Sequence, residues 1–202
     1  MFAKAREKAR SSSCQSNLKQ IGLAIRQYNS DYDERYPQGW QNSNYTWAVT
    51  ISAYLKSNQV YVCPSSTNTT RAPWLTNAAV PLTSYAYNRQ FGIDSGTLNE
   101  AALKASSNTI IMFDSGLNGI NNAPYADLTG ADKSMGWVTS APNDGSWCWG
   151  CVVNAADYNW AAPSPRHMDM TNVLYSDGHV KTQKLDSFWT NNSAWLDPAS
   201  GG

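Results

Sequence analysis

The sequence predicts an α+β fold in which a long N-terminal helix packs on an antiparallel sheet of about four strands. Three observations support this: helical periodicity over the first 33 residues, short strand-like runs later in the chain, and an Asp-Gly pair between two alternating runs. The chain has 202 residues, of which 42% are hydrophobic and 12% aromatic, so it can bury a real core. We therefore predict an amphipathic shaft helix over residues 1–35 and a globular head over 36–202.

Apolar residues recur on one face of the predicted helix at steps of three and four. They are Cys14, Leu18, Ile21, Ile25, Tyr28 and Tyr32. The positions that would extend this face toward the N-terminus hold Lys4, Glu7 and Arg10. We therefore expect the buried face to begin only at Cys14, and the first half of the helix to project from the head.

The opposite face of the helix carries a second stripe of mostly small residues. Its members are Phe2, Ala5, Ala9, Ser12, Ser16 and Leu23. Small side chains would let a neighbouring helix approach closely. The alternative is that alanine and serine are solvated here and Leu23 is an ordinary exposed leucine, and periodicity alone favours that alternative.

Charge along the chain excludes some classes of partner. The formal net charge is zero, while the first ten residues contain Lys4, Arg6, Lys8 and Arg10 against the single acid Glu7. No broad basic surface for nucleic acid follows from this balance. A basic helix start suits a membrane surface or an acidic neighbour. No run reaches the roughly 18 apolar residues of a membrane-spanning helix.

Three acids crowd the predicted end of the helix before Pro37, where the helix dipole disfavours them. Asp31, Asp33 and Glu34 are candidate oxygen ligands for a hard cation such as calcium. They lack the spacing of an EF-hand loop, which favours a solvated acidic turn instead.

The four cysteines form an even set, which is typical of exported proteins with disulfides. Cys148 and Cys151 have the two-residue spacing of zinc knuckles and redox motifs. No second such pair exists, and His167 and His179 are the only histidines, so a disulfide is favoured over zinc. Cys14, on the buried helix face, is placed to meet Cys63 and join the helix to the head.

Local patterns place the elements of the head. A second helix is expected over residues 44–56, with Asn44 as its cap and Trp47, Ile51, Tyr54 and Leu55 on one side. Residues 59–63 are expected to be extended, 84–88 to form a strand, and 98–104 a short helix. Residues 109–113 are apolar and β-branched and have the length of a central strand.

Residues 115–165 form an irregular insertion with little periodicity. It contains Trp137, Trp147, Trp149 and Trp160 together with several aspartates. Long insertions are usually functional surfaces, so a stacking platform for sugars and a calcium-bound loop both merit consideration. Aromatic residues packed on the sheet or between subunits are the more ordinary explanation.

The segment 172–183 gives the clearest local signal. Asp177-Gly178 between two alternating runs predicts a two-residue type I′ hairpin with Tyr175 opposite Val180. Val173, Tyr175, Val180 and Thr182 would then share one face. His167 precedes the hairpin, where a hydrogen bond would fix the incoming chain. A catalytic role would need a nucleophile or a second ligand, and none is identifiable, so we expect no enzyme.

Several of these segments resemble a known bacterial family. Residues 2–10, 14–24 and 31–34 resemble the region just after the membrane helix in type IV pilin-like proteins, or pseudopilins. Cys63-Pro64-Ser65, the run 84–88, and His167 followed after nine residues by Asp177-Gly178 look like the prepilin-type processing-associated subfamily. The insertion 115–165 has no counterpart in this resemblance.

The resemblance implies a filament subunit of a type IV pilus or type II secretion pseudopilus on the bacterial cell envelope. It implies a leader and a hydrophobic half-helix ahead of Phe2, cleaved and N-methylated by a prepilin peptidase, with membrane contact only through that segment. The partners would be copies of the same chain and other pilin-like subunits. Phe2, Ala5, Ala9 and Leu23 then become an expected assembly surface.

Two further expectations follow from the resemblance. Related pseudopilins use calcium to hold a loop, so calcium is the cofactor to test. The competing function is a carbohydrate-binding or adhesin-type minor pilin that acts through the Trp-rich insertion.

Overall fold

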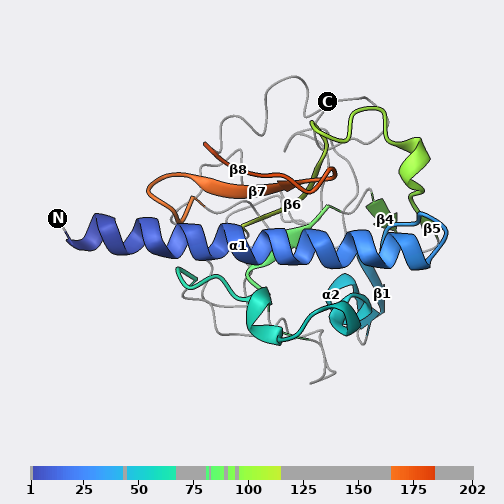
Figure 1. Cartoon of the computed structure of the whole chain (residues 1–202), viewed down its shortest axis with the longest axis horizontal. Coiled ribbons are helices and arrows are strands. Elements are labelled where there is room, and N and C mark those ends of the chain that lie inside the picture. Colours follow the sequence, from blue (N-terminus) through green and yellow to red (C-terminus); the bar gives the residue numbers. More distant parts are fainter. Residues whose placement is uncertain are drawn as a thin grey trace, which may run out of the picture.

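The computed structural model describes residues 2–42, 45–66, 81, 83–88, 91–93, 96–114 and 165–184. The fold is α+β, as predicted: a long helix, α1 (Phe2–Asp31), runs along a four-stranded antiparallel sheet (Figure 1). The strands lie in the order β3 (Tyr85–Tyr87), β6 (Ile110–Asp114), β7 (Thr171–Tyr175) and β8 (Val180–Gln183). Among the described elements, α1 contacts β7 and β8 on one side and short 3₁₀ segments on the other.

The apolar face of α1 forms the centre of the core. Cys14, Leu18 and Ile21 are fully buried, and Ile25 is 2% exposed. The predicted face fades at its C-terminal end, where Tyr28 is half-buried and Tyr32 is 52% exposed. The two tyrosine rings instead stack on each other, with centroids 4.2 Å apart.

Contact between α1 and the head begins well before Cys14, contrary to the sequence-based expectation. Ser11 is only 8% exposed, and the Glu7 side chain is 21% exposed. Glu7 lies on the same helix face as Cys14, and its carboxylate has hydrogen-bond partners in the head. Glu7, although charged, therefore continues the buried face of α1 toward the N-terminus instead of ending it.

Gly22 allows the helix to lie close to the sheet. A Cβ atom at this position would lie 2.9 Å from Leu174 Cδ1 on β7. That distance is shorter than a normal carbon–carbon contact of about 3.5–4.0 Å. The absence of a side chain at Gly22 therefore sets the spacing between α1 and β7.

Residues of the three strands β3, β6 and β7 are buried on both faces of the sheet. β6 is an internal strand, as its apolar sequence predicted, and it pairs with β3 and β7. The register shifts between Ile110 and Met112, which marks a bulge in the β6–β7 pairing. β8 forms one end of the sheet and is partly exposed.

The β7–β8 hairpin forms as predicted, but its register differs by one residue. Leu174, not Tyr175, is opposite Val180, and Gly178 N–H donates to the Tyr175 carbonyl. Ser176 makes the difference: its N–H donates to the Thr109 carbonyl and its hydroxyl to Ser106.

The loop therefore has three residues, with Gly178 at φ +93°. The shift changes which residues share a face. Val180 and Thr182 lie with Asn172 and Leu174, on the side that contacts α1, and not with Val173 and Tyr175 as predicted.

The region between α1 and β3 is less regular than predicted. β1 (Trp40–Asn42) and β2 (Tyr45–Thr46) form a small hairpin, followed by one turn of helix, α2 (Trp47–Thr50). The expected second helix continues only as the 3₁₀ segment η1 (Ser52–Tyr54), and its expected cap, Asn44, lies outside the described residues.

Residues 59–63 do not form the predicted extended run, because η2 (Asn58–Tyr61) is a 3₁₀ helix whose start is capped by Ser57. The remaining short elements are β4 (Gly92–Ile93), β5 (Gly96–Thr97) and η4 (Glu100–Ala102). η4 stands where the short helix over 98–104 was expected.

Some of the sequence-based predictions fall outside the described residues. These include Cys148, Cys151 and nearly all of the Trp-rich insertion 115–165. Within the described part, none of the helices has the length and apolar character needed to cross a membrane.

Candidate functional site

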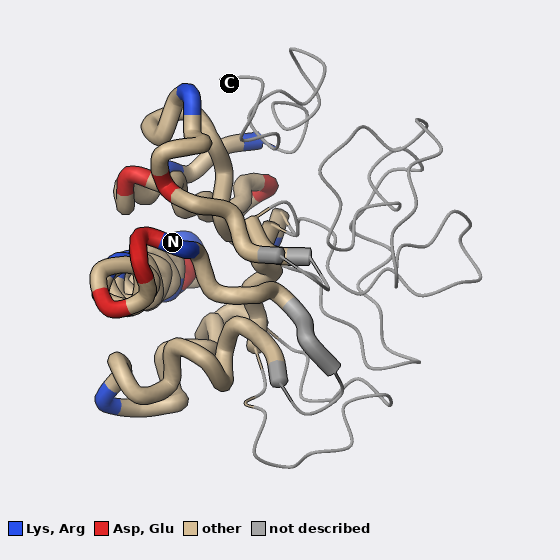
Figure 2. Tube along the Cα trace, turned by 90° about the vertical axis from the view of Figure 1, so that its right-hand side faces the viewer, with Lys and Arg blue, Asp and Glu red and all other residues tan. Residues whose placement is uncertain are grey.

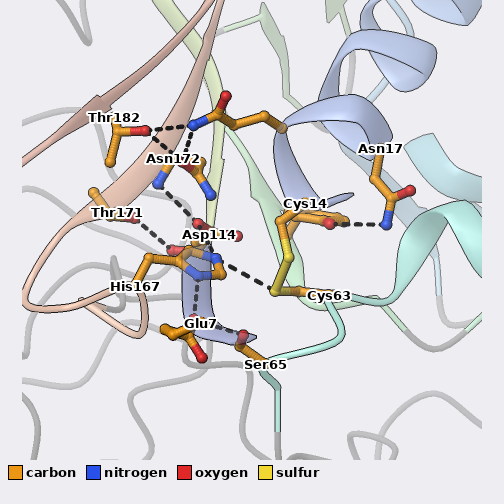
Figure 3. Close-up of polar contacts among 12 residues, drawn as sticks. Glu7, Cys14, Asn17, Cys63, Ser65, Asp114, His167, Thr171, Asn172 and Thr182 are labelled. Carbon is orange, nitrogen blue, oxygen red and sulfur yellow. Dashed lines mark hydrogen bonds and ion pairs between the residues drawn. A yellow bond between two sulfur atoms is a disulfide. The ribbon is translucent and has the colours of Figure 1, made fainter. Parts of the chain in front are cut away.

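The most distinctive chemistry lies where four segments of the chain meet (Figure 3). These segments are α1, the loop after η2, the end of β6 and the turn before β7. They bring together a disulfide, a buried histidine and two carboxylates, which are supplied by Cys14, Cys63, His167, Glu7 and Asp114.

The disulfide joins Cys14 on α1 to Cys63, as sequence reasoning expected for this pair. Both residues are fully buried, and their Cα atoms are 5.2 Å apart. Nearby, Asn17 Nδ2 donates to the Val62 carbonyl at 3.1 Å. The bond closes a loop with a sequence separation of 49 residues. The chain-entropy relation gives such a cross-link about 4 kcal/mol of stabilisation.

His167 occupies the centre of the site and is 2% exposed. Its Nδ1 lies 2.7 Å from Glu7 Oε1 and its Nε2 lies 3.2 Å from Asp114 Oδ2. Cys63 Sγ is 3.5 Å from the same Nε2. The imidazole is thus held between two carboxylates from distant parts of the chain and touches the disulfide.

A tight turn presents His167 to these partners. The His167 N–H donates to the Met170 carbonyl at 3.0 Å, and the Met170 N–H donates back at 3.2 Å. The two residues between them, Met168 and Asp169, have φ angles of +55° and +62°. This left-handed region is costly for residues other than glycine, by roughly 1–2 kcal/mol each. The contacts of His167 must therefore compensate for a strained turn.

Both carboxylates are themselves hydrogen-bonded. The Ser65 hydroxyl donates to Glu7 Oε1 at 2.8 Å. The Asn172 backbone N–H donates to Asp114 Oδ2 at 2.8 Å, and Asp114 is fully buried. Asp114 Oδ1 has no hydrogen-bond partner among the described residues, although it is buried. An unpaired buried oxygen is unusual in folded proteins.

The electrostatics favour a charged pair between His167 and Glu7. Burial lowers the pKa of His167, but hydrogen bonds and charge from Asp114 and then Glu7 outweigh it, so its pKa is raised above 6.5. Burial raises the pKa of Glu7, but hydrogen bonds from Ser65 and His167 and the positive charge of His167 outweigh it, so its pKa is lowered. His167 is therefore more readily protonated than an isolated histidine.

The described side chains around His167 do not form a nucleophile–base pair. The Cys63 sulfur is already bonded to Cys14, and the Ser65 hydroxyl donates to Glu7 rather than to the imidazole. What the arrangement does is fix positions: it ties α1, β6 and the start of β7 to one another through a charged network and a covalent bond.

The assembly residues named from the sequence lie on the exposed side of α1. Phe2 is 82% exposed and Leu23 is 61% exposed, and Ala5 and Ala9 are also exposed. Viewed along the helix, α1 lies at one side of the described fold, with other segments above and below it (Figure 2). The stripe therefore has no partner within the described part of the chain.

The structure separates the members of the His167–Asp177–Gly178 motif. His167 precedes β7, whereas Asp177 and Gly178 follow it, and five strand residues lie between them. Asp177 Oδ1 accepts from the His179 N–H at 3.0 Å and lies 2.7 Å from His179 Nδ1. The motif thus consists of a buried network at one end of β7 and a turn at the other.

The calcium candidates at the end of α1 do not converge. Asp31 Oδ2 accepts a hydrogen bond from the Tyr54 hydroxyl at 2.7 Å, and Asp33 and Glu34 have φ angles of +51° and +59°. Within the described residues, these acids belong to no group of three or more side chains whose ligand atoms come together. These observations agree with the solvated acidic turn that the sequence favoured over a cation site at this helix end.

A different group of potential ligands does come together. Cys14, Cys63, Asp114 and His167 each contribute one ligand-type atom, and these atoms lie within 4.8 Å of one another. Sequence reasoning missed Glu7 and Asp114. The available signals were the position of Glu7 on the face of Cys14 and the place of Asp114 directly after an apolar strand.

Comparison with known proteins gives one partial match. Residues 3–78 match the model of a family described as "Protein of unknown function (DUF1559)". This family is associated with pilin-like, prepilin-type proteins. The matched region includes α1 except its first residue, Phe2, together with Cys63 and Ser65, and it ends before β3. No curated protein and no solved structure matches the chain.

Proposed function

We propose that the protein is a structural subunit of a filament on the bacterial cell envelope, of the type IV pilus or type II secretion pseudopilus kind. The observation that carries this proposal is the division of α1 into two faces. One face is fixed to the head, and the opposite face, from Phe2 to Leu23, is exposed along about 30 Å of helix.

The fixed face gives α1 the rigidity that a filament shaft needs. The disulfide holds the helix at Cys14, and the carboxylate of Glu7 binds His167 two turns earlier. Near the other end, Arg26 Nη1 lies 2.7 Å from Glu100 Oε1. Contacts at three levels along the helix keep the head and the shaft in one orientation, which regular assembly requires.

Charge on α1 supports contact between copies of the chain. Lys4, Arg6, Lys8 and Arg10 are all exposed near the N-terminus. At the other end, the exposed residues include three acids, Asp31 as the last residue of α1 and Asp33 and Glu34 just after it, against one exposed base, Arg35. Staggered copies would place the basic end of one helix beside the acidic end of another. This pairing would also offset the repulsion among the like charges within each end.

The exposed stripe gives the direct test. Ala5→Glu together with Ala9→Glu adds bulk and charge to the stripe and leaves Glu7 and Cys14 in place. In the bacterium that makes the protein, this variant should produce few or no filaments by electron microscopy. The expected reason is that two helices can no longer approach closely, and that desolvating a carboxylate at a contact is costly.

The matched control is Ala5→Ser with Ala9→Ser, which keeps both side chains small. This variant should assemble normally. Circular dichroism and the thermal midpoint of both purified variants should match wild type, because both positions are exposed. Normal filaments from the glutamate variant would refute the proposed role of this surface.

A further inference from the structure

The side chains around the disulfide carry the atoms that zinc prefers in proteins. Cys14, Cys63, His167 and Asp114 are buried, and their ligand-type atoms gather within 4.8 Å of one another. Zinc takes four such sulfur, nitrogen and oxygen ligands in a tetrahedron. We propose that, when the Cys14–Cys63 disulfide is reduced, the protein binds one zinc ion at these four residues.

Two edges of the required tetrahedron are already present. With Zn–S near 2.3 Å and Zn–N near 2.05 Å, a tetrahedral sulfur–nitrogen edge is about 3.6 Å. Cys63 Sγ and His167 Nε2 are 3.5 Å apart. A nitrogen–oxygen edge is about 3.4 Å by the same geometry, and His167 Nε2 lies 3.2 Å from Asp114 Oδ2.

A third edge, of the six in a tetrahedron, is the disulfide itself. The two sulfur atoms are bonded, and in a zinc site they would lie about 3.8 Å apart. Rotation of the two cysteine side chains can supply this separation with small backbone movement, because their Cα atoms are already 5.2 Å apart. Reduction is therefore the event that opens the site.

The partners of these ligands match the usual surroundings of zinc sites. Histidines that bind zinc normally use their second nitrogen to donate to a carboxylate, which fixes the ring. Glu7 fills this role, with Oε1 2.7 Å from His167 Nδ1, and Ser65 holds Glu7 in turn. This arrangement leaves Nε2 directed at Asp114 and Cys63.

Asp114 adds an independent observation. It is fully buried at the end of β6, yet its Oδ1 atom has no hydrogen-bond partner in the described part of the chain. Its Oδ2 atom is positioned by the Asn172 backbone N–H. A metal ion bound through Oδ2 would also lie beside Oδ1 of the same carboxylate, and its positive charge would compensate the oxygen that lacks a hydrogen bond.

The chemistry balances with a cellular or added dithiol as reductant. The dithiol gives two electrons and two protons to the Cys14–Cys63 bond and becomes a cyclic disulfide, which leaves two cysteine thiols. Both thiols lose their protons when they bind Zn²⁺, and His167 binds through unprotonated Nε2. All four ligands then come from the protein, which is the pattern of a structural site rather than a catalytic one.

The experiment uses a base variant in which Cys148 and Cys151 are serine, because that pair has zinc-knuckle spacing of its own. The base variant is prepared oxidised and, separately, reduced with a phosphine, which takes the oxygen of one water molecule to become a phosphine oxide and leaves the two cysteine thiols. Each form is titrated with Zn²⁺ and with Co²⁺ under nitrogen. The reduced form should hold one metal per chain after gel filtration, and its cobalt spectrum should show thiolate charge transfer with intense tetrahedral bands. The oxidised form should hold none.

Further substitutions identify the ligands. Asp114→Asn should weaken zinc binding at least tenfold, and Glu7→Ala, which removes only the support of His167, should weaken it about 10- to 100-fold. Asp177→Asn is the matched control, since Asp177 pairs with His179 at the surface, and it should leave the affinity unchanged. Circular dichroism of the oxidised variants verifies that each one folds.

Two outcomes would overturn the proposal. One is a reduced base variant that holds no zinc after gel filtration. The other is zinc uptake that Asp114→Asn and Glu7→Ala leave unchanged, because the metal would then sit on the two thiols alone. Neither outcome bears on filament formation, which the Ala5 and Ala9 variants test separately.

Discussion

Replacing His167 with alanine should strongly destabilise the oxidised protein, because it leaves a buried carboxylate without its ion-pair partner. His167 is 2% exposed, and it is the ion-pair partner of Asp114, which is fully buried. Without the imidazole, the Asp114 carboxylate remains in the core with only the Asn172 N–H as a donor among the described residues. Removing one partner of a buried ion pair costs about 3–5 kcal/mol.

Two comparison variants separate this cost from lost packing. Glu7→Ala leaves His167 paired with Asp114, and the Glu7 side chain is 21% exposed, so its cost should be about 1 kcal/mol. The double variant His167→Ala with Asp114→Ala removes both partners and should be more stable than His167→Ala alone, because the stranded charge is gone.

Urea unfolding of the oxidised proteins, followed by circular dichroism, gives the free energies directly. If His167→Ala does not fold, His167→Gln replaces it, since a Gln amide can still donate to one carboxylate. The reasoning fails if the histidine variant loses less than about 1 kcal/mol. It also fails if removing Asp114 in addition lowers stability further, because the buried charge would then not be the source of the cost.

Three further outcomes are expected. In the oxidised protein, the raised pKa of His167 contributes stability that is fully present below pH 6.5 and is lost as the pH rises through the folded-state pKa. The lowered pKa of Glu7 has the opposite dependence: its contribution is present above pH 4.5 and is lost as the pH falls below that value. The stability difference between wild type and His167→Gln, measured by urea unfolding from pH 5 to 9, should therefore shrink toward alkaline pH; a constant difference would contradict this. Met168→Gly should stabilise the protein by about 1 kcal/mol in the same assay, because Met168 is 44% exposed and has φ +55°; unchanged or lower stability would show that the turn is not strained. Gly22→Ala should cost about 1 kcal/mol despite its better helix propensity, because the added Cβ meets Leu174 at 2.9 Å; adding Leu174→Val should recover part of that loss.

The fold was largely predictable because its main elements have strong local signals. The periodic face of α1, the apolar run of β6 and the Asp-Gly turn each depend on residues close in sequence. The hairpin register was wrong by one residue because Ser176 is held by Ser106 and Thr109, about 70 residues away. A tertiary contact of that kind leaves no trace in the alternation of the strand itself.

The candidate site was predictable only in part. Cys14 and Cys63 were paired correctly because one lies on the apolar helix face and the other precedes a proline. Glu7 was interpreted as the end of the buried face, since nothing near it in sequence indicates that His167, 160 residues later, supplies a buried partner. Asp114 was passed over because an acid after a strand is usually a solvated loop residue.

Two of the attachments of α1, at Glu7 and at Cys14, have a mechanical consequence. A helix held at one point can still rotate about its axis. Glu7 and Cys14 are seven residues apart, so they lie on nearly the same side of α1 two turns from each other, and together they fix its rotation. Ala5 and Ala9 are each two residues from Glu7, so each points about 160° away from the clamped side. A helix that docks against Ala5 and Ala9 therefore determines the direction in which the head faces. Because α1 cannot rotate relative to the head, a torque applied to the head is transmitted to the helix.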